Sequence, residues 1–265
     1  MTPAQQSLLD AITNVLEADT RIESAWLHGS LAHDAGDEWS DIDVIAICAS
    51  GAAEDAIRRY VTNPGAFVPT VFANVLFGQV LNVVTKDWRR FDILFAERDI
   101  FRQFPAMHYR QLFNKTIAAP PKNPSPPPAP PRPARVKMAI DEFLRILGLL
   151  PIVIGREEYV NALSGITHLR TQTINLMVEE NGIEPWDRGG ALHVNRLITP
   201  DQRAELETLG PIEATRESII EGHLAFARLF LPRARTVAKK FGTPWPQALE
   251  DATRAHLEGT LGVTF

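Results

Sequence analysis

The 265-residue sequence has a single cysteine, Cys48, so no disulfide bond can form within the chain. Cys48 lies in an apolar run, where a small buried side chain is the simplest interpretation. No apolar run is long enough to span a membrane, and residues 1–6 lack the basic region and apolar segment of a signal peptide. These absences predict a cytoplasmic protein with no membrane partner.

An excess of positive charge is also absent. The chain has 27 Lys and Arg against 32 Asp and Glu, which gives a formal net charge of -5. A protein that binds a nucleic-acid backbone usually presents a basic face, so the composition argues against DNA or RNA as partner. A hydrophobic content of 45% is typical of a globular protein, and the length suffices for one large or two ordinary domains.

Proline is concentrated in one segment, with nine prolines among residues 120–133. Such a segment has few amide donors and favours the polyproline II conformation, so it cannot join a core. A spacer between domains is the favoured interpretation, and a ligand for another domain is the alternative. We therefore predict a first domain at 1–118, a linker at 119–134 and a second domain at 135–265.

Hydrophobic periodicity differs on the two sides of this segment. Before it, apolar residues from Leu8 to Leu16 recur at helical spacing, and alternating runs indicate strands. The expected strands are 22–28, 42–48, 71–77, 80–85 and 91–95, with a further helix at 52–61. Short links between the last three strands favour antiparallel pairing.

After the prolines, helices are expected at 136–150, 157–180, 201–209, 213–231 and 246–257. Thr199-Pro200 is a helix start signal, and Asn181-Gly182 is a stop signal. The predicted fold class is α+β, with a mixed or antiparallel sheet and flanking helices followed by an all-helical domain.

Polar residues stand at the ends of two predicted strands. The strand 22–28 ends at Gly29-Ser30, and Asp41 and Asp43 open the next strand. Residues two apart in a strand share a face, so the two carboxylates are expected to project together. Neighbouring carboxylates repel unless a cation lies between them, and oxygen ligands of this kind suit Mg²⁺ with substrate phosphates. The pattern points to phosphate chemistry.

Asp92 is the third candidate acid. It interrupts the apolar run 91–95, so it is expected on the face opposite to Phe91 and Ile93. A carboxylate is costly to bury there without a metal or cationic partner. Three acids lie nearer to turns or strand ends, where solvated charge is the better interpretation: Asp87, Glu97 and Asp99.

With these residues the chain resembles the DNA polymerase β-like nucleotidyltransferase superfamily, and in particular its aminoglycoside nucleotidyltransferase branch. Members carry Gly-Ser after the first strand, a D-x-D motif about ten residues later and a third acid on a later strand. The resemblance covers roughly residues 5–100. In the helical half it extends only to size and placement.

The resemblance implies roles for five residues. Gly29 and Ser30 would bind the triphosphate, Asp41 and Asp43 would hold Mg²⁺, and Asp92 would complete a second metal site and orient or deprotonate the acceptor. It implies transfer of a nucleoside monophosphate, AMP from ATP, to a hydroxyl of a small molecule of aminoglycoside or lincosamide type. Two alternatives are an antitoxin-like enzyme acting on a protein or tRNA, and a non-catalytic nucleotide-binding module.

Other polar residues admit both a functional and an ordinary interpretation. His28 and His33 could contact a phosphate or cap a strand end, and Arg89 and Arg90 could neutralise phosphate charge or form an exposed pair. The acids of the helical half could line a pocket for a cationic acceptor, although a solvated helix face is favoured. These acids are Glu157, Glu158, Glu179, Glu180 and Asp187. We have no chemical account of the loop 189–196.

Overall fold

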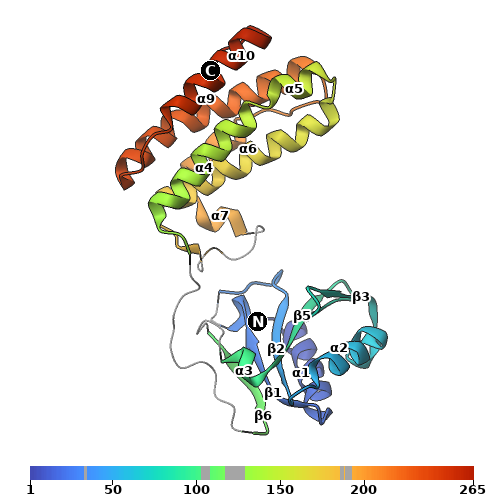
Figure 1. The fold of residues 1–265 in the computed structure, drawn as a ribbon. Coiled ribbons are helices and arrows are strands. Elements are labelled where there is room, and N and C mark those ends of the chain that lie inside the picture. The colour runs from blue at the N-terminus through green and yellow to red at the C-terminus, as the bar shows by residue number, and fades with distance from the viewer. Residues whose placement is uncertain (33–34, 103–107, 117–128, 186–187, 189–192) are drawn as a thin grey trace. The chain divides into compact units, whose positions relative to one another are not determined.

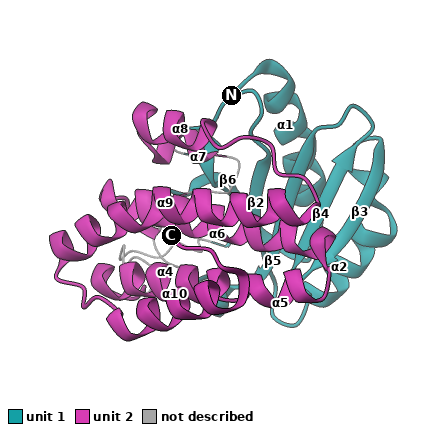
Figure 2. Ribbon diagram, turned by 90° about the horizontal axis from the view of Figure 1, so that it is seen from above, with its two compact units in different colours: residues 1–127 teal, residues 128–265 magenta. Residues whose placement is uncertain are grey.

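The computed structural model describes residues 1–32, 35–102, 108–116, 129–185, 188 and 193–265 (Figure 1). The chain divides into two compact units, Met1–Pro127 and Pro128–Phe265, which Figure 2 shows in different colours. Each unit has a hydrophobic core of its own. The first unit is a mixed sheet with flanking helices and the second is helical, so the predicted α+β class is confirmed. Among the described residues, no helix is both long and apolar enough to span a membrane.

The first unit contains the predicted helices and strands, together with a short helix, α3, and a strand, β6, that were not predicted. Its helices are α1 (Pro3–Ala18), α2 (Ala53–Thr62) and α3 (Arg98–Phe101), and its strands are β1 (Ile22–His28), β2 (Ile42–Cys48), β3 (Thr70–Leu76), β4 (Val80–Thr85), β5 (Arg90–Glu97) and β6 (Arg110–Asn114). Every predicted strand lies within two residues of its observed bounds at each end.

The described strands form one sheet in the order β3-β4-β5-β2-β1-β6. Strands β2 and β5 pair in parallel, and all the other pairs are antiparallel. The short links around β4 give antiparallel neighbours as predicted. In the β3–β4 turn, Phe77 and Gly78 have φ angles of 52° and 71°, the positive values that tight hairpin turns require.

Helices α1 and α2 cover one face of this sheet. Alternate residues of the central strands point into the core beneath these helices, among them Val44 of β2 and Ile93 of β5. The residues between them project from the opposite face, where a smaller apolar cluster surrounds Ile45 and Ile47. Cys48 is 1% exposed in the main core, so its prediction as a buried structural residue is confirmed.

The second unit consists of helices whose largest members pack on one another. Its helices are α4 (Arg132–Leu147), α5 (Leu150–Gly155), α6 (Tyr159–Glu180), α7 (Val194–Leu197), α8 (Pro200–Glu207), α9 (Arg216–Phe241) and α10 (Gln247–Leu261). Between α4 and α9 the rings of Phe143 and Phe230 stack with centroids 3.8 Å apart.

Two expectations for the helical half need correction. The predicted helix 136–150 is two helices, because Pro151 in the first turn of α5 begins a new helix after Gly148. The helix predicted to end at Leu231 continues through Pro232 to Phe241. Buried residues on both sides of Pro232 hold α9 in the core, so tertiary packing outweighs the backbone hydrogen bond that proline removes.

Both predicted helix signals are confirmed. Thr199 caps α8 in a reciprocal arrangement with Gln202, and Pro200 occupies the first turn. Helix α6 ends at Glu180, and Gly182 follows with a φ of 78°. Most of the linker predicted at 119–134 falls on residues 117–128, which lie outside the described part of the chain. Helix α4 begins at Arg132, inside the predicted linker.

Candidate active site

A row of polar residues crosses the sheet on the face opposite to α1 and α2. Asp43 of β2 lies directly beside Asp92 of β5 in the parallel ladder, and Asp43 also pairs with His28 of β1. Asp92 in turn pairs with Asn82 of β4, which pairs with Asn74 of β3. Residues directly opposite each other in a ladder project from the same face. Strands β2 and β5, which carry the two acids, are labelled in Figure 1.

The sequence pattern explains why both carboxylates stand on this face. Ile42 and Val44 flank Asp43, and Phe91 and Ile93 flank Asp92; all four are at most 1% exposed in the core. Because the side-chain period of a strand is two, burying the flanking residues turns the acid between them to the other face. The parallel register of β2 and β5 then places the two acids side by side.

Asp41 precedes β2 in a loop that α1 holds in place. The side chain of Gln5 is 4% exposed, and its Nε2 donates hydrogen bonds of 2.8 Å to the carbonyl of Asp37 and 2.9 Å to that of Ser40. Nη2 of Arg90 lies 3.8 Å from Oδ2 of Asp41. The loop therefore places Asp41 at the margin of the site, beside the guanidinium group of Arg90.

The two neighbouring arginines have different roles. Arg90 faces Asp41 and also donates a hydrogen bond of 3.2 Å to the carbonyl of Trp39. Arg89 binds Asp87 and donates to the carbonyl of Ala4, so it is engaged away from the acids. Of the pair, only Arg90 is placed where it can neutralise phosphate charge.

Burial and like charge raise the pKa of Asp43 to about 7, with burial the larger cause and Asp41 and Asp92 adding to it. Burial also raises the pKa of Asp92, an effect that the hydrogen bond from Asn82 opposes. Arg90 offsets part of the repulsion at both acids. The site holds more negative charge than its own cation balances, so a bound cation would relieve it.

Gly29 allows Asp43 to lie against the turn that follows β1. Its φ is 69°, and a Cβ at this position would lie 2.2 Å from Oδ2 of Asp43. Only glycine accommodates both the backbone conformation and this close approach. Ser30 then opens the 3₁₀ turn Ser30–Ala32. The predicted turn at Gly29 and the predicted acid Asp43 are therefore neighbours in space.

The histidines of this region differ. At the end of the polar row, burial lowers the pKa of His28 to about 4, so its imidazole is neutral at physiological pH. His33 lies outside the described residues. A neutral His28 is suited to a hydrogen bond and not to charge pairing with a phosphate.

The residues present fit a divalent cation that shares its ligands with a substrate. Asp41, Asp43 and Asp92 supply carboxylate oxygens, which Mg²⁺ prefers, and the charge between them is undercompensated. Within the described ranges, no group of three or more His, Cys, Asp or Glu side chains is arranged to hold a metal by itself. Mg²⁺ usually keeps waters and takes further oxygens from phosphates, so a site completed by a nucleotide suits this donor set.

Asn82 and Gln5 contribute to the site but were not predicted from the sequence. Nδ2 of Asn82 donates a hydrogen bond of 2.6 Å to Oδ1 of Asp92. Asn82 interrupts the apolar run 80–84 just as Asp92 interrupts its own, so the same signal could have found it. Gln5 gave no comparable signal, because its partners are backbone carbonyls 32 and 35 residues away.

The acids of the helical half do not form one group. Glu179 is 2% exposed and binds Arg135 and Arg188, so it is neither solvated nor open to a ligand, and both interpretations of it were wrong. Glu180 binds Arg233. Glu157 and Glu158 are exposed, as a solvated face requires, and Asp187 lies outside the described residues. Of the loop 189–196, residues 189–192 lie outside them too, and Val194 begins α7.

No protein-family model and no curated protein matches this sequence. Similar solved structures are nucleotidyltransferases or resemble them. An aminoglycoside 6-adenyltransferase from Bacillus subtilis is 14% identical, with 98% of this chain and 99% of that chain covered and a TM-score of 0.44. A nucleotidyltransferase-like protein from Exiguobacterium sibiricum is 14% identical, with 98% and 88% covered and a TM-score of 0.33.

A STING-associated c-di-GMP synthase from Capnocytophaga granulosa is also 14% identical, with 89% of this chain and 80% of that chain covered and a TM-score of 0.30. Identities of 14% and TM-scores of 0.30 to 0.44 do not show the function of this chain.

Proposed function

We propose that this protein is a Mg²⁺-dependent nucleotidyltransferase that moves AMP from ATP onto a hydroxyl group of a small molecule. The observation that carries the proposal is the pairing of Asp43 and Asp92 on adjacent strands, partly buried, with Asp43 against the Gly29 turn. Two such carboxylates have no structural advantage in a sheet, because each costs desolvation and repels the other. Their placement supports a site that binds a cation and phosphates.

Asp41, Asp43 and Asp92 would hold the metal. When bound, Mg²⁺ would neutralise charge on the phosphates and lower the barrier to attack at the α-phosphorus. Arg90 would add positive charge at the margin, where it already faces Asp41. The Gly29 turn would let the backbone approach the triphosphate, and the hydroxyl of Ser30 would donate to a phosphate oxygen.

Asp92 would act on the acceptor. In the transfer step, the hydroxyl oxygen of the acceptor bonds to the α-phosphorus, and its proton passes to the carboxylate of Asp92. The bond between the α-phosphorus and the bridging oxygen breaks, and pyrophosphate leaves. Asn82 holds Oδ1 of Asp92, which leaves Oδ2 for the proton or the metal. Most of the rate would come from positioning and charge neutralisation.

The acceptor class rests on charge and on the family resemblance. A net charge of -5 suits a cationic acceptor such as an aminoglycoside, with a lincosamide as the related possibility, and disfavours a nucleic acid. An acceptor on a protein or a tRNA end, and a module that only binds nucleotide, are the competing proposals. A cytoplasmic location remains part of the proposal.

The test is Mg²⁺-dependent turnover of labelled ATP in the presence of aminoglycosides, lincosamides, tRNA or cell extract. The quantity measured is the release of pyrophosphate. Asp43→Asn and Asp92→Asn should each abolish transfer, while Asp55→Asn on the exposed face of α2 should not. Retained turnover in Asp43→Asn would refute the metal role. Calorimetric binding of ATP without turnover on any acceptor would favour the non-catalytic module.

A further inference from the structure

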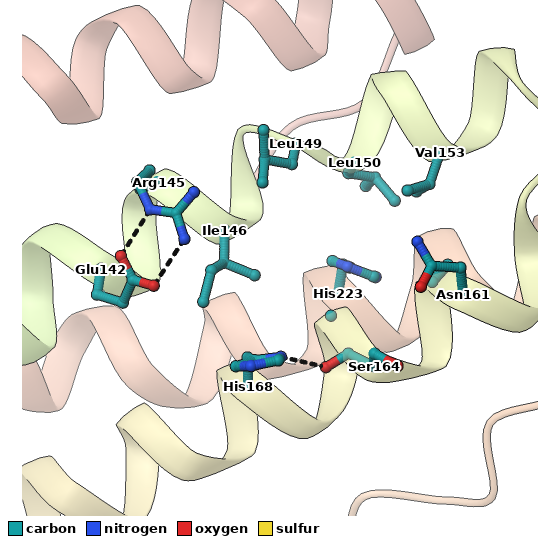
Figure 3. A pocket seen from close by; sticks show the side chains of 12 residues that line it. Glu142, Arg145, Ile146, Leu149, Leu150, Val153, Asn161, Ser164, His168 and His223 are labelled. Carbon is teal, nitrogen blue, oxygen red and sulfur yellow. Dashed lines mark hydrogen bonds and ion pairs between the residues drawn. The ribbon is translucent and has the colours of Figure 1, made fainter.

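The helical unit contains a cavity of about 280 Å³ between α4, α5, α6 and α9 (Figure 3). One wall is apolar and is formed by Ile146, Leu150, Val153 and Ala162. Its volume lies near the lower end of the range for small-molecule sites. All the lining residues belong to this unit.

A buried histidine lines this cavity. His223 is 2% exposed, and its Nδ1 lies 2.8 Å from the carbonyl oxygen of Ile219. A carbonyl oxygen only accepts hydrogen bonds, so Nδ1 carries the proton and Nε2 of the neutral ring is an acceptor. Within the part of the chain that the structure describes, Nε2 has no hydrogen-bond partner. His223 lines the cavity, so a hydrogen-bond donor of a bound molecule can reach this free acceptor.

Gly165 keeps Nε2 of His223 accessible. It lies in the interior of α6 and lines the cavity, and a Cβ at this position would lie 3.2 Å from Nε2. Glycine in the interior of a helix makes the helix less stable than alanine does. At position 165 this cost accompanies the space that the missing Cβ leaves, and this space lies in front of Nε2.

Among the other polar groups that line the cavity, Asn161 is exposed and uncharged, and three more have partners. Glu142 accepts hydrogen bonds of 2.6 and 2.7 Å from Arg145, which makes this pair neutral. Nδ1 of His168 lies 2.7 Å from the carbonyl of Ser164, as Figure 3 shows. Burial lowers the pKa of His223, so its ring stays neutral at physiological pH. The cavity therefore does not select for a charged ligand.

We propose that this cavity binds a small neutral molecule with an apolar body and one hydroxyl group, and that the hydroxyl donates its hydrogen bond to Nε2 of His223. The apolar wall would take the body of the ligand and Gly165 would admit the hydroxyl. The proposal assigns a binding site whose lining comes from the helical unit alone.

Phenol and anisole are matched probes, because methylation of the hydroxyl removes the donor and keeps the ring. The full-length protein is titrated with each, and the imidazole NMR signals of His223 are followed. Phenol should shift these signals saturably and bind about fivefold more tightly than anisole, as expected for one hydrogen bond. Equal affinities, or no saturable shift with phenol, would overturn the proposal.

Gly165→Ala tests the route to Nε2 without changing the histidine. The variant should lose the preference for phenol and keep a helical circular dichroism spectrum. Gly259→Ala is the matched control, since Gly259 lies in α10 and an added Cβ would meet nothing within 4 Å. The control should keep the preference. A phenol preference that survives in Gly165→Ala would place the contact elsewhere. If the variant does not fold, the comparison of phenol with anisole in the unaltered protein is the deciding test.

Discussion

Nδ2 of Asn82 on β4 donates a hydrogen bond of 2.6 Å to Oδ1 of Asp92 on β5, and the two residues are direct cross-strand partners. The bond fixes the orientation of a partly buried carboxylate. It also favours the ionised form of Asp92, against the burial that raises its pKa. Asn82 is thus a positioning residue for the acid proposed to act on the acceptor.

Replacement of Asn82 by leucine should lower kcat by about 10- to 100-fold, because a hydrogen bond to a charged group contributes roughly 1.5–3 kcal/mol. The KM for ATP should change less, since Asp43 and the Gly29 turn remain. Loss of the bond raises the pKa of Asp92, so the acid limb of the kcat profile should move to higher pH. Steady-state kinetics over a pH series measures both effects.

Asn74→Ala is the matched control for this variant. Asn74 is the next residue in the polar row, but it is exposed, and its Oδ1 accepts a hydrogen bond from the backbone of Val75. This variant should keep the parental kcat and pH profile. If Asn82→Leu also keeps both, Asn82 does not position Asp92.

Gly29→Ala should abolish the proposed transfer activity, while a comparable glycine tolerates the same change. The new Cβ would lie 2.2 Å from Oδ2 of Asp43, so the carboxylate must move, and the residue must also hold a φ of 69°. Gly51→Ala imposes a similar φ of 73° with no neighbour within 4 Å of the added Cβ. The two variants should lose similar backbone stability, about 1 kcal/mol each, but only Gly29→Ala should lose transfer activity and binding of Mn²⁺ measured by electron paramagnetic resonance.

The sequence was sufficient to place the strands β1 to β5 and to predict the face of the sheet on which Asp43 and Asp92 lie. The alternation of apolar and polar residues around Asp43 and Asp92 predicted that each acid points away from the main core. Their direct pairing follows from the parallel ladder between β2 and β5, which the structure shows. The strand β6 was missed, because a five-residue strand with three polar residues has a weak pattern and pairs with β1, far away in sequence. Its existence depends on tertiary contacts that no local signal reports.

The difference between local sequence signals and tertiary contacts also explains which features of the helical half were predicted. The start of α8 was predicted because Thr199 and Pro200 act within one turn. The passage of α9 through Pro232 was not, because it depends on core residues packed on other helices. Glu179 was misinterpreted for a similar reason, since two of its arginine partners, Arg132 and Arg135, lie more than 40 residues away.

Asp43 should make the metal-free protein less stable as pH rises. Its pKa in the folded state, about 7, lies above the ordinary value of 3.8, so the folded state favours the protonated carboxyl. The resulting stability is fully present below about pH 4 and is lost as pH rises through 7. The side chain at position 43 of the variant Asp43→Asn does not titrate, so the variant does not lose this stability. Each unit of pKa shift corresponds to about 1.4 kcal/mol, so the free energy of unfolding of the variant at pH 8 should exceed that of the parent protein by a few kcal/mol.

Urea unfolding in EDTA at pH 5 and pH 8 measures this difference for both proteins. The difference in free energy of unfolding between Asp43→Asn and the parent protein should grow with pH. Addition of Mg²⁺ and ATP at pH 8 should stabilise the parent protein and leave Asp43→Asn unchanged, since only the parent can bind the pair. A gap that is independent of pH would mean that Asp43 titrates normally in the folded protein.

Glu179 should be essential for the stability of the helical unit. It is 2% exposed at the end of α6, and its carboxylate accepts hydrogen bonds of 2.7 and 2.9 Å from Arg135 of α4. Burial would raise its pKa, but the hydrogen bonds from Arg135 and Arg188 outweigh burial and lower it. Glu179→Gln leaves guanidinium groups without their counter-charge, and we expect a loss of about 2–4 kcal/mol, near the cost of breaking a buried ion pair.

The control is Glu207→Gln, which removes an exposed partner of Arg203 on α8 and should cost less than about 1 kcal/mol. Urea unfolding monitored by helical circular dichroism compares the two variants. Because the pKa of Glu179 is lowered in the folded state, its contribution is present above the ordinary glutamate range and is lost as pH falls. The cost of Glu179→Gln should therefore shrink in acid, whereas a cost that stayed constant would mean that shape and not charge accounts for it.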